Sequence, residues 1–172
     1  MEKVKITSGK YRGREITTPG AGTHPMGARE KLALFNMIAE NLPNATVLDA
    51  YAGSGALGIE ALSRGAKEVI FVEKNTQAAK VIRQNLVTLG LDGEIITGDI
   101  LNFHTDAKFD VILADPPYDK FEVAGVEHLL QFLNNGGILV LSHPDGAPKL
   151  PGVELLKTRK YAAAHLSVYA KL

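Results

Sequence analysis

The sequence contains no cysteine in 172 residues. This absence excludes disulfide bonds and thiolate metal sites, and it favours a reducing compartment. No apolar run approaches the roughly 20 residues that a membrane-spanning helix needs. The first ten residues, MEKVKITSGK, also lack the apolar core of a signal peptide. We therefore expect a cytoplasmic protein with no membrane contact.

Histidine is scarce as well, and the five histidines form no close pair at metal-ligand spacing. They are His24, His104, His128, His143 and His165. We expect them on the surface or in loops, and we expect no bound metal ion.

The chain has no excess of charge of either sign, because 19 Lys and Arg balance 19 Asp and Glu. A net charge of zero argues against a general nucleic-acid binder. The charge is nevertheless uneven: residues 1–31 carry seven basic residues against three acidic ones. This basic segment is either a solvated face or a surface for an anionic partner.

The length and composition are those of one soluble globular domain. Two short strands within residues 3–18, around Gly9 to Gly13, predict a hairpin arm. The Gly- and Pro-rich residues 19–27 predict a linker. We therefore divide the chain into a basic arm and linker, 1–27, and a domain, 28–172. The first helix of that domain is expected over about 28–41, with an apolar stripe made of Leu32, Phe35, Ile38, Ala39 and Leu42.

From residue 45 onward, apolar strands alternate with helices. This pattern predicts a mostly parallel, seven-stranded Rossmann-like α/β sheet covered on both faces, with an antiparallel C-terminal pair finishing it. Asn75 is expected to cap the helix that Gly90 ends. The expected strands span 45–50, 67–73, 94–99, 109–115, 136–143, 153–162 and 165–172, and the expected helices 56–65, 75–90 and 120–134.

Four successive strands end in an acid, namely Asp49, Glu73, Asp99 and Asp115. In open α/β sheets, ligands bind beyond the carboxyl ends of the strands. We therefore expect the functional site at this edge of the sheet.

After the first of these strands, Gly53, Gly55 and Gly58 match G-x-G-x-x-G, the dinucleotide fingerprint. A nicotinamide dehydrogenase is therefore one possibility. However, Asp49 stands just before the loop and would repel a pyrophosphate, which prefers helix N–H groups. A cationic ligand would instead be attracted, and S-adenosylmethionine carries a sulfonium and an ammonium group.

The next two strand ends suit the rest of that ligand. Glu73 can accept hydrogen bonds from two ribose hydroxyls, a role that it would also have in a dinucleotide site. Asp99 can accept from the adenine amino group, and Ile100 can contact the ring through its backbone N–H and side chain. Taken alone, Asp99 could equally be a helix N-cap.

The fourth strand runs into Asp-Pro-Pro-Tyr, residues 115–118. Each proline fixes φ and lacks an N–H, so we expect a stiff, extended segment from Asp115 to Tyr118. The Asp115 carboxylate and the Pro116 carbonyl could each accept one N–H of an exocyclic amine, and Tyr118 could stack on its ring. The alternative is a Pro-Pro turn with a capping aspartate.

Several segments together resemble one family. AYAGSGALGIEALSRGA and DPPY look like the bacterial 16S ribosomal RNA guanine-N2 methyltransferases of the RsmD type, and SGKYRGR and ALFN are also similar to that family. The likeness covers nearly the whole chain. The sequence departs from the family at residues 24–28, His-Pro-Met-Gly-Ala, where the family usually has Arg-Pro-Thr-Thr/Ser-Asp.

The resemblance implies a class I methyltransferase fold, S-adenosylmethionine as donor, and a guanine of 16S rRNA in a small ribosomal subunit or its assembly intermediate as acceptor. It also implies a monomer. The alternatives are adenine-N6 methylation of RNA or DNA, and a non-catalytic RNA-binding relative. Cofactor binding is expected from Asp49, Tyr51, Ala52, Gly53, Ser54, Gly55, Glu73, Lys74, Asp99 and Ile100, catalysis from Asp115, Pro116, Pro117 and Tyr118, and RNA binding from Lys10, Arg12, Arg14, Arg29 and Lys31.

Overall fold

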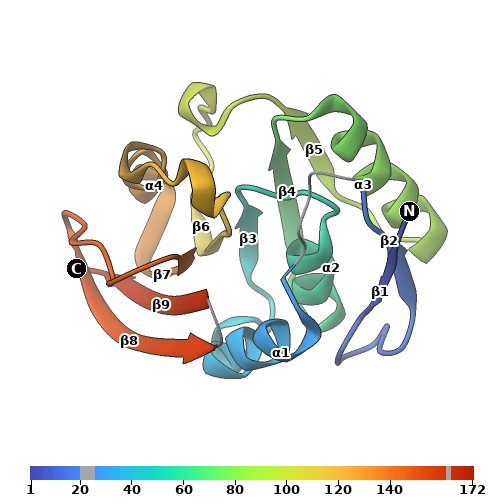
Figure 1. Ribbon diagram of the computed structural model, residues 1–172, viewed down its shortest axis with the longest axis horizontal. Helices are drawn as coiled ribbons and strands as arrows, with labels where there is room; N and C mark the ends of the chain where they lie inside the picture. Colours follow the sequence, from blue (N-terminus) through green and yellow to red (C-terminus); the bar gives the residue numbers. More distant parts are fainter. Residues whose placement is uncertain (20–25, 162–163) are drawn as a thin grey trace.

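The computed structural model describes residues 1–19, 26–161 and 164–172. Its centre is a seven-stranded sheet with the order β5-β4-β3-β6-β7-β9-β8, beside a separate two-stranded hairpin, β1-β2 (Figure 1). Among the described strands of the large sheet, only β9 runs against its neighbours, which confirms the predicted mostly parallel α/β class. The strands are β1 Lys3–Lys5, β2 Glu15–Thr17, β3 Thr46–Asp49, β4 Glu68–Glu73, β5 Glu94–Thr97, β6 Phe109–Ala114, β7 Leu133–His143, β8 Val153–Tyr161 and β9 Ala164–Lys171.

The helix α3 begins and ends where its capping residues predict. The Asn75 side chain accepts a hydrogen bond from Ala78 N at 2.9 Å, and Gly90 ends α3 with φ +68°. In the described part of the chain, no helix combines the length and the apolar character that crossing a bilayer requires. The helices are α1 Ala28–Met37, α2 Ala56–Ser63, α3 Thr76–Leu89 and α4 Val123–Leu129, with short 3-10 turns η1 Ala39–Asn41, η2 Ile100–Asn102, η3 Tyr118–Lys120 and η4 Leu130–Phe132.

The predicted apolar stripe of the first helix is partly wrong. Leu32 is 42% exposed and Ala39 is also exposed, whereas Lys31 is buried beside Leu34. The buried face of the helix differs from the predicted stripe because Lys31 points inward, where it forms an ion pair with Glu60. The α-helix also ends at Met37, and the 3-10 turn η1 follows.

The helix predicted over 120–134 is likewise too long. Its α-helical part covers only Val123–Leu129, and Leu133 already belongs to β7, where it pairs with Phe109. The ladder between β6 and β7 is irregular between Phe109 and Val111. This irregularity accommodates the extra residues at the start of the long strand β7.

Two apolar clusters cover the two faces of the sheet. The first joins α1, α2, α3 and the hairpin to one face, through residues such as Phe35, Ile59 and Phe71. The second joins α4 and η2 to the other face, around Ile112 and Leu139. Because both faces are covered, the edge at the carboxyl ends of the strands is left for the site.

The hairpin is fastened to α2 by a buried carboxylate, Glu60. Its oxygens accept hydrogen bonds from Thr7 N at 2.9 Å, Thr7 Oγ1 at 2.8 Å and Ser8 N at 3.1 Å. Lys31 Nζ and Arg64 Nε lie 3.5 and 2.9 Å from the same carboxylate. The predicted boundary between an arm and a domain stays a prediction, although the hairpin packs closely on the rest of the chain.

Candidate active site

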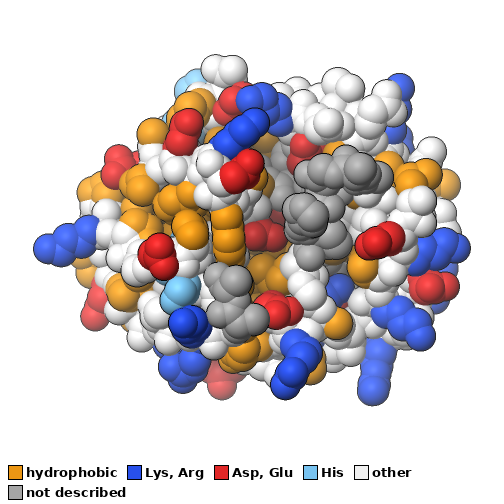
Figure 2. All heavy atoms as spheres, in the orientation of Figure 1, with side chains coloured by type: hydrophobic (Ala, Val, Ile, Leu, Met, Phe, Trp, Pro, Cys, Tyr) orange, Lys and Arg blue, Asp and Glu red, His pale blue; other side chains and the backbone are white. Residues whose placement is uncertain are grey.

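Three carboxylates meet at the carboxyl ends of β3, β4 and β6. Asp49 at the end of β3 pairs with Leu113 of β6, which places Asp115 just beyond it. The Asp49 side chain is 1% exposed and accepts a hydrogen bond from Gly58 N at 2.9 Å. Burial raises the pKa of Asp49 to about 7 against that hydrogen bond, and the charges of Asp115 and Glu73 add to the increase. Figure 2 shows acidic side chains at the floor of a hollow near the middle of this face.

The glycine loop between β3 and α2 has the geometry that its spacing predicts. Gly55 stands at the N-terminus of α2 with φ +82°, a conformation that favours glycine. Gly58 lies against the sheet so closely that a Cβ there would come within 2.3 Å of the Phe71 ring. This contact brings the first turn of α2 onto β4, and the Gly58 N–H thereby reaches Asp49.

The second strand end ties the loop to the sheet. Glu73 Oε1 accepts from Gly53 N at 2.8 Å, and Glu73 Oε2 accepts from Asn75 N at 2.6 Å. Ala52 N donates to Val72 O at 3.0 Å, and the Ser54 carbonyl accepts from Asn85 Nδ2 at 3.0 Å. The loop therefore has a fixed shape that depends on the side chains of Glu73 and Asn85.

Asp99 takes the helix-capping role that its position allowed, and its expected role toward adenine stays a prediction. Its Oδ1 accepts from Leu101 N at 2.9 Å and so caps η2, while Lys74 Nζ lies 3.5 Å from Oδ2. The backbone hydrogen bond and Lys74 hold the pKa of this carboxyl below its usual range. Beside it, Ile100 is 7% exposed, and the hydroxyl of Tyr51 packs close to Gly125.

This donor set fits a cationic nucleoside ligand. Among the ion pairs of the described residues, none gives Asp49, Glu73 or Asp115 a basic partner. A cluster of unneutralised carboxylates is costly, and a bound cation would stabilise it. A Cβ at Gly53 or Gly98 would meet no atom within 4 Å, so there is open space next to both loops. S-adenosylmethionine has the charge and the hydroxyl groups that these residues can bind.

The Asp-Pro-Pro-Tyr segment, residues 115–118, lies beside these carboxylates and is called the corner below. Pro117 is extended, with φ −63° and ψ 131°, but Tyr118 already begins the 3-10 turn η3. The predicted extended segment is therefore one residue too long. Burial raises the pKa of Asp115 to about 6, although a hydrogen bond from Ser142 lowers it. Ser142 also hydrogen-bonds the hydroxyl of Tyr118.

Ser142 is a site residue that the sequence alone did not reveal. It comes from the carboxyl end of β7, the strand next to β6, and is 2% exposed. It contacts both polar side chains of the corner and so fixes them relative to each other. The one signal in the sequence was a serine near the end of an apolar strand. It was not sufficient, because the partners of this serine depend on which strand lies next to β6.

Known proteins resemble the chain along nearly its whole length. The family model described as Conserved hypothetical protein 95 matches residues 4–170. YlbH of Bacillus subtilis, a candidate rRNA methyltransferase, is 34% identical, and the match covers 98% of this chain and 99% of YlbH. The ribosomal RNA small subunit methyltransferase D of Haemophilus influenzae is 38% identical over 67% of this chain and 64% of its own. The chain belongs to the RsmD family of S-adenosylmethionine-dependent methyltransferases.

A solved structure agrees with the RsmD assignment. The candidate methyltransferase yhhF from Escherichia coli superposes with a TM-score of 0.88 at 25% identity, covering 99% of this chain and 98% of yhhF. The methyltransferase fold implied by the sequence motifs is therefore confirmed. The roles of individual site residues stay predictions at this point.

The basic residues expected to bind RNA separate into two groups in this RsmD family chain. Lys10, Arg12 and Arg14 lie at or near the hairpin turn, and Arg29 lies on α1; all four are exposed. Figure 2 shows Lys and Arg side chains along the side of the molecule where Figure 1 places the hairpin. Lys31 is different. It is 2% exposed and binds Glu60 and the Lys5 carbonyl, so the expectation that it contacts RNA is wrong.

The expectation that all the histidines are surface or loop residues is also wrong. His143 is fully buried in β7, where its Nε2 hydrogen-bonds Ser167 Oγ at 2.6 Å, and it stacks on His165 of β9 with ring centroids 5.7 Å apart. Their positions opposite each other in neighbouring antiparallel strands explain the pairing. His24 and Pro25 of the departing segment lie outside the described residues.

Proposed function

We propose that this RsmD family protein methylates the exocyclic N2 amine of a guanine in 16S ribosomal RNA. The observation that carries the proposal is that two sites are neighbours: the Asp115–Tyr118 corner follows the strand that pairs with β3, next to the buried carboxylate Asp49 of the cofactor site. The names of the relatives, which include small-subunit rRNA methyltransferases, support RNA as the acceptor. The substrate is RNA in a small-subunit particle, and the enzyme acts as a cytoplasmic monomer.

The residues of the donor side bind and orient the cofactor. S-adenosylmethionine supplies a methyl group on a positively charged sulfur when it is bound. The buried carboxylate of Asp49 attracts the cationic end of this ligand. Glu73 accepts from the ribose hydroxyls, and Asp99 with Ile100 holds the adenine. The loops at the carboxyl ends of β3 and β4 also contain the other expected cofactor-binding residues, Tyr51, Ala52, Ser54 and Lys74.

The residues of the corner activate the acceptor amine, whose lone pair is delocalised into the base and therefore poorly nucleophilic. The Asp115 carboxylate and the Pro116 carbonyl each accept one N–H, which aims the nitrogen lone pair at the methyl carbon. The carboxylate also stabilises the positive charge that develops on nitrogen. The proton then leaves to Asp115 or to water. Tyr118, with its hydroxyl held by Ser142, stacks on the base.

Product analysis tests this proposal. The purified protein is incubated with labelled S-adenosylmethionine and either naked 16S rRNA or small-subunit particles, and the nucleosides are separated by mass spectrometry. We expect N2-methylguanosine, with faster methylation of particles than of naked RNA. N6-methyladenosine would instead support the adenine alternative, because an Asp-Pro-Pro-Tyr corner suits that amine too. RNA binding without donor binding by calorimetry would identify a non-catalytic relative.

A further inference from the structure

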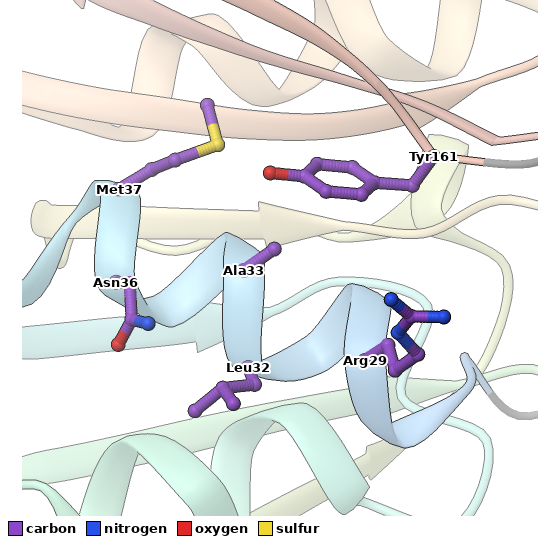
Figure 3. Close-up of a pocket in the computed structure, with 6 residues that line it drawn as sticks. All are labelled: Arg29, Leu32, Ala33, Asn36, Met37 and Tyr161. Atoms are coloured by element: carbon purple, nitrogen blue, oxygen red, sulfur yellow. The ribbon is translucent and has the colours of Figure 1, made fainter.

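A second concave surface lies outside the cofactor site and the corner. It is a pocket of about 420 Å³ between α1 and the end of β8, within the size range of small-ligand sites. Figure 3 shows Ala33 and Met37 pointing from α1 toward the strand that carries Tyr161, whose ring lies across from them. The guanidinium of Arg29 stands near the N-terminal end of the helix, and Leu32 and Asn36 complete the lining.

The strand ladders place this pocket on the same edge of the sheet as the corner. Ser142 pairs with Leu166 of β9, and Leu166 pairs with Arg159 of β8. Tyr161 stands two residues further along β8, three strands away from β6. At roughly 4.8 Å between strands, Tyr161 is about 15 Å from the corner. This distance is a short step along an extended single strand of RNA.

The first turn of α1 connects the two places. Burial is the main cause that raises the pKa of Tyr118, and the charge of Glu30 is among the smaller ones. The charge of Glu30 therefore reaches the corner, and Arg29, next to it in α1, lines the pocket. A nucleic-acid strand that left the corner along α1 would reach this pocket next.

The chemistry of the pocket suits a nucleotide. Tyr161 and Met37 pack partly against the apolar core, so the ring is braced from one side while it also lines the pocket. Among the described residues that line the pocket, none is acidic, and Arg29 is exposed. Lys157, Arg159 and Lys160 of β8 are exposed as well. A braced aromatic ring with a nearby arginine is the combination that binds single-stranded bases and their phosphates.

We infer that this pocket receives the base of a nucleotide that flanks the methylated one, with Tyr161 stacking on the base and Arg29 binding a phosphate. This inference rests on the proposed RNA methyltransferase function and makes Tyr161 a substrate-binding residue of that reaction. A simpler explanation of the β8 lysines is that charges protect an edge strand from pairing with other chains. That explanation gives no role to Arg29 or to the pocket.

The experiment combines protein variants with RNA in which single bases are removed. Steady-state methylation is measured for the unaltered protein, Tyr161→Ala and Tyr161→Phe, using RNA with one abasic nucleotide at each position near the target. For Tyr161→Ala we expect the KM for RNA to rise roughly 5- to 100-fold. The affinity for S-adenosylmethionine should not change, and Tyr161→Phe should stay within about twofold because the ring remains. Removing one particular flanking base should raise the KM of the unaltered protein similarly and have no further effect on Tyr161→Ala.

Arg29→Gln, with Arg83→Gln on the exposed side of α3 as its matched control, tests the phosphate contact. We expect only Arg29→Gln to weaken RNA binding and to reduce the slope of log affinity against log salt by about one. Additive effects of Tyr161→Ala and every abasic position would overturn the inference. So would an unaltered protein that tolerates each missing flanking base, a result that does not depend on how any variant folds. Failure of the guanine assignment is recognised separately, from the identity of the methylated nucleoside.

Discussion

The donor half and the acceptor half of the site are held in place by different means. On the donor side, backbone N–H groups satisfy Asp49, Glu73 and Asp99, and the fastened hairpin reinforces the loop. On the acceptor side, the two polar side chains of the corner share one buried hydroxyl, that of Ser142. The donor half is therefore held by several hydrogen bonds between side chains and backbone groups, whereas the acceptor half depends on one side-chain hydroxyl.

The largest effect should come from breaking the buried network that fastens the hairpin. Glu60→Ala removes the shared partner of Lys31 and Arg64, whose side chains are 3% and 10% exposed. Breaking a buried ion pair typically lowers the free energy of unfolding by about 3–5 kcal/mol. Urea denaturation checks this value, with the exposed Glu68→Ala as control. A loss no larger than that of Glu68→Ala would mean that the hairpin is not fastened through Glu60.

The same network has a defined pH dependence. Burial raises the pKa of Glu60, but hydrogen bonds from Thr7 and Arg64 and the charge of Lys31 outweigh it and hold the pKa below its usual value of 4.5. A lowered folded-state pKa adds stability at pH values above 4.5, and this contribution is lost as the pH falls through the folded-state value. The difference in stability between the unaltered protein and Glu60→Ala should therefore shrink in acid.

A substitution in the acceptor half should lower turnover without weakening the binding of S-adenosylmethionine. Asp115→Ala removes the carboxylate that orients the amine and stabilises its developing charge, so we expect kcat to fall by about 10²- to 10³-fold. Calorimetry should give an S-adenosylmethionine affinity within about twofold of the unaltered protein. Asp119→Ala, an exposed acid on the adjacent turn, is the matched control. Equal losses of donor affinity and turnover would show that the two halves are not separable.

Within the donor half, the glycine loop is joined to the hairpin by one buried amide, Asn85. Its Nδ2 donates to Thr17 O of the hairpin at 2.8 Å and to Ser54 O of the glycine loop at 3.0 Å. Asn85→Asp keeps the shape but turns two attractive contacts into repulsive ones. We expect a loss of about 1–3 kcal/mol of stability and a severalfold weaker donor affinity. Asn41→Asp, an exposed change, is the control; unchanged donor affinity in Asn85→Asp would mean that the loop keeps its shape without this contact.

The difference between local and long-range contacts explains how much of the fold and the site the sequence could predict. The glycine loop, the cap at Asn75 and the acids at the strand ends are local signals, and the structure agrees with their geometry because neighbouring residues determine it. Ser142 and the burial of Lys31 were missed because each depends on a partner far along the chain. A lysine in an amphipathic helix looks solvent-facing until the position of Glu60 is known.

The prediction that tests the donor half most directly concerns the proton coupled to Asp49. Burial raises its pKa to about 7 in the free protein, and a cationic ligand should lower it by favouring the carboxylate. Binding should therefore release a proton near pH 7, and donor affinity should weaken by up to about tenfold for each unit of pH below that value. Calorimetry in buffers of different ionisation enthalpy measures the proton directly.

Asp49→Asn should bind the donor more weakly, with no proton release and no pH dependence in this range. A donor affinity that is constant between pH 6 and 8 in the unaltered protein would separate Asp49 from the cationic group and leave the attraction to Glu73 or Asp115.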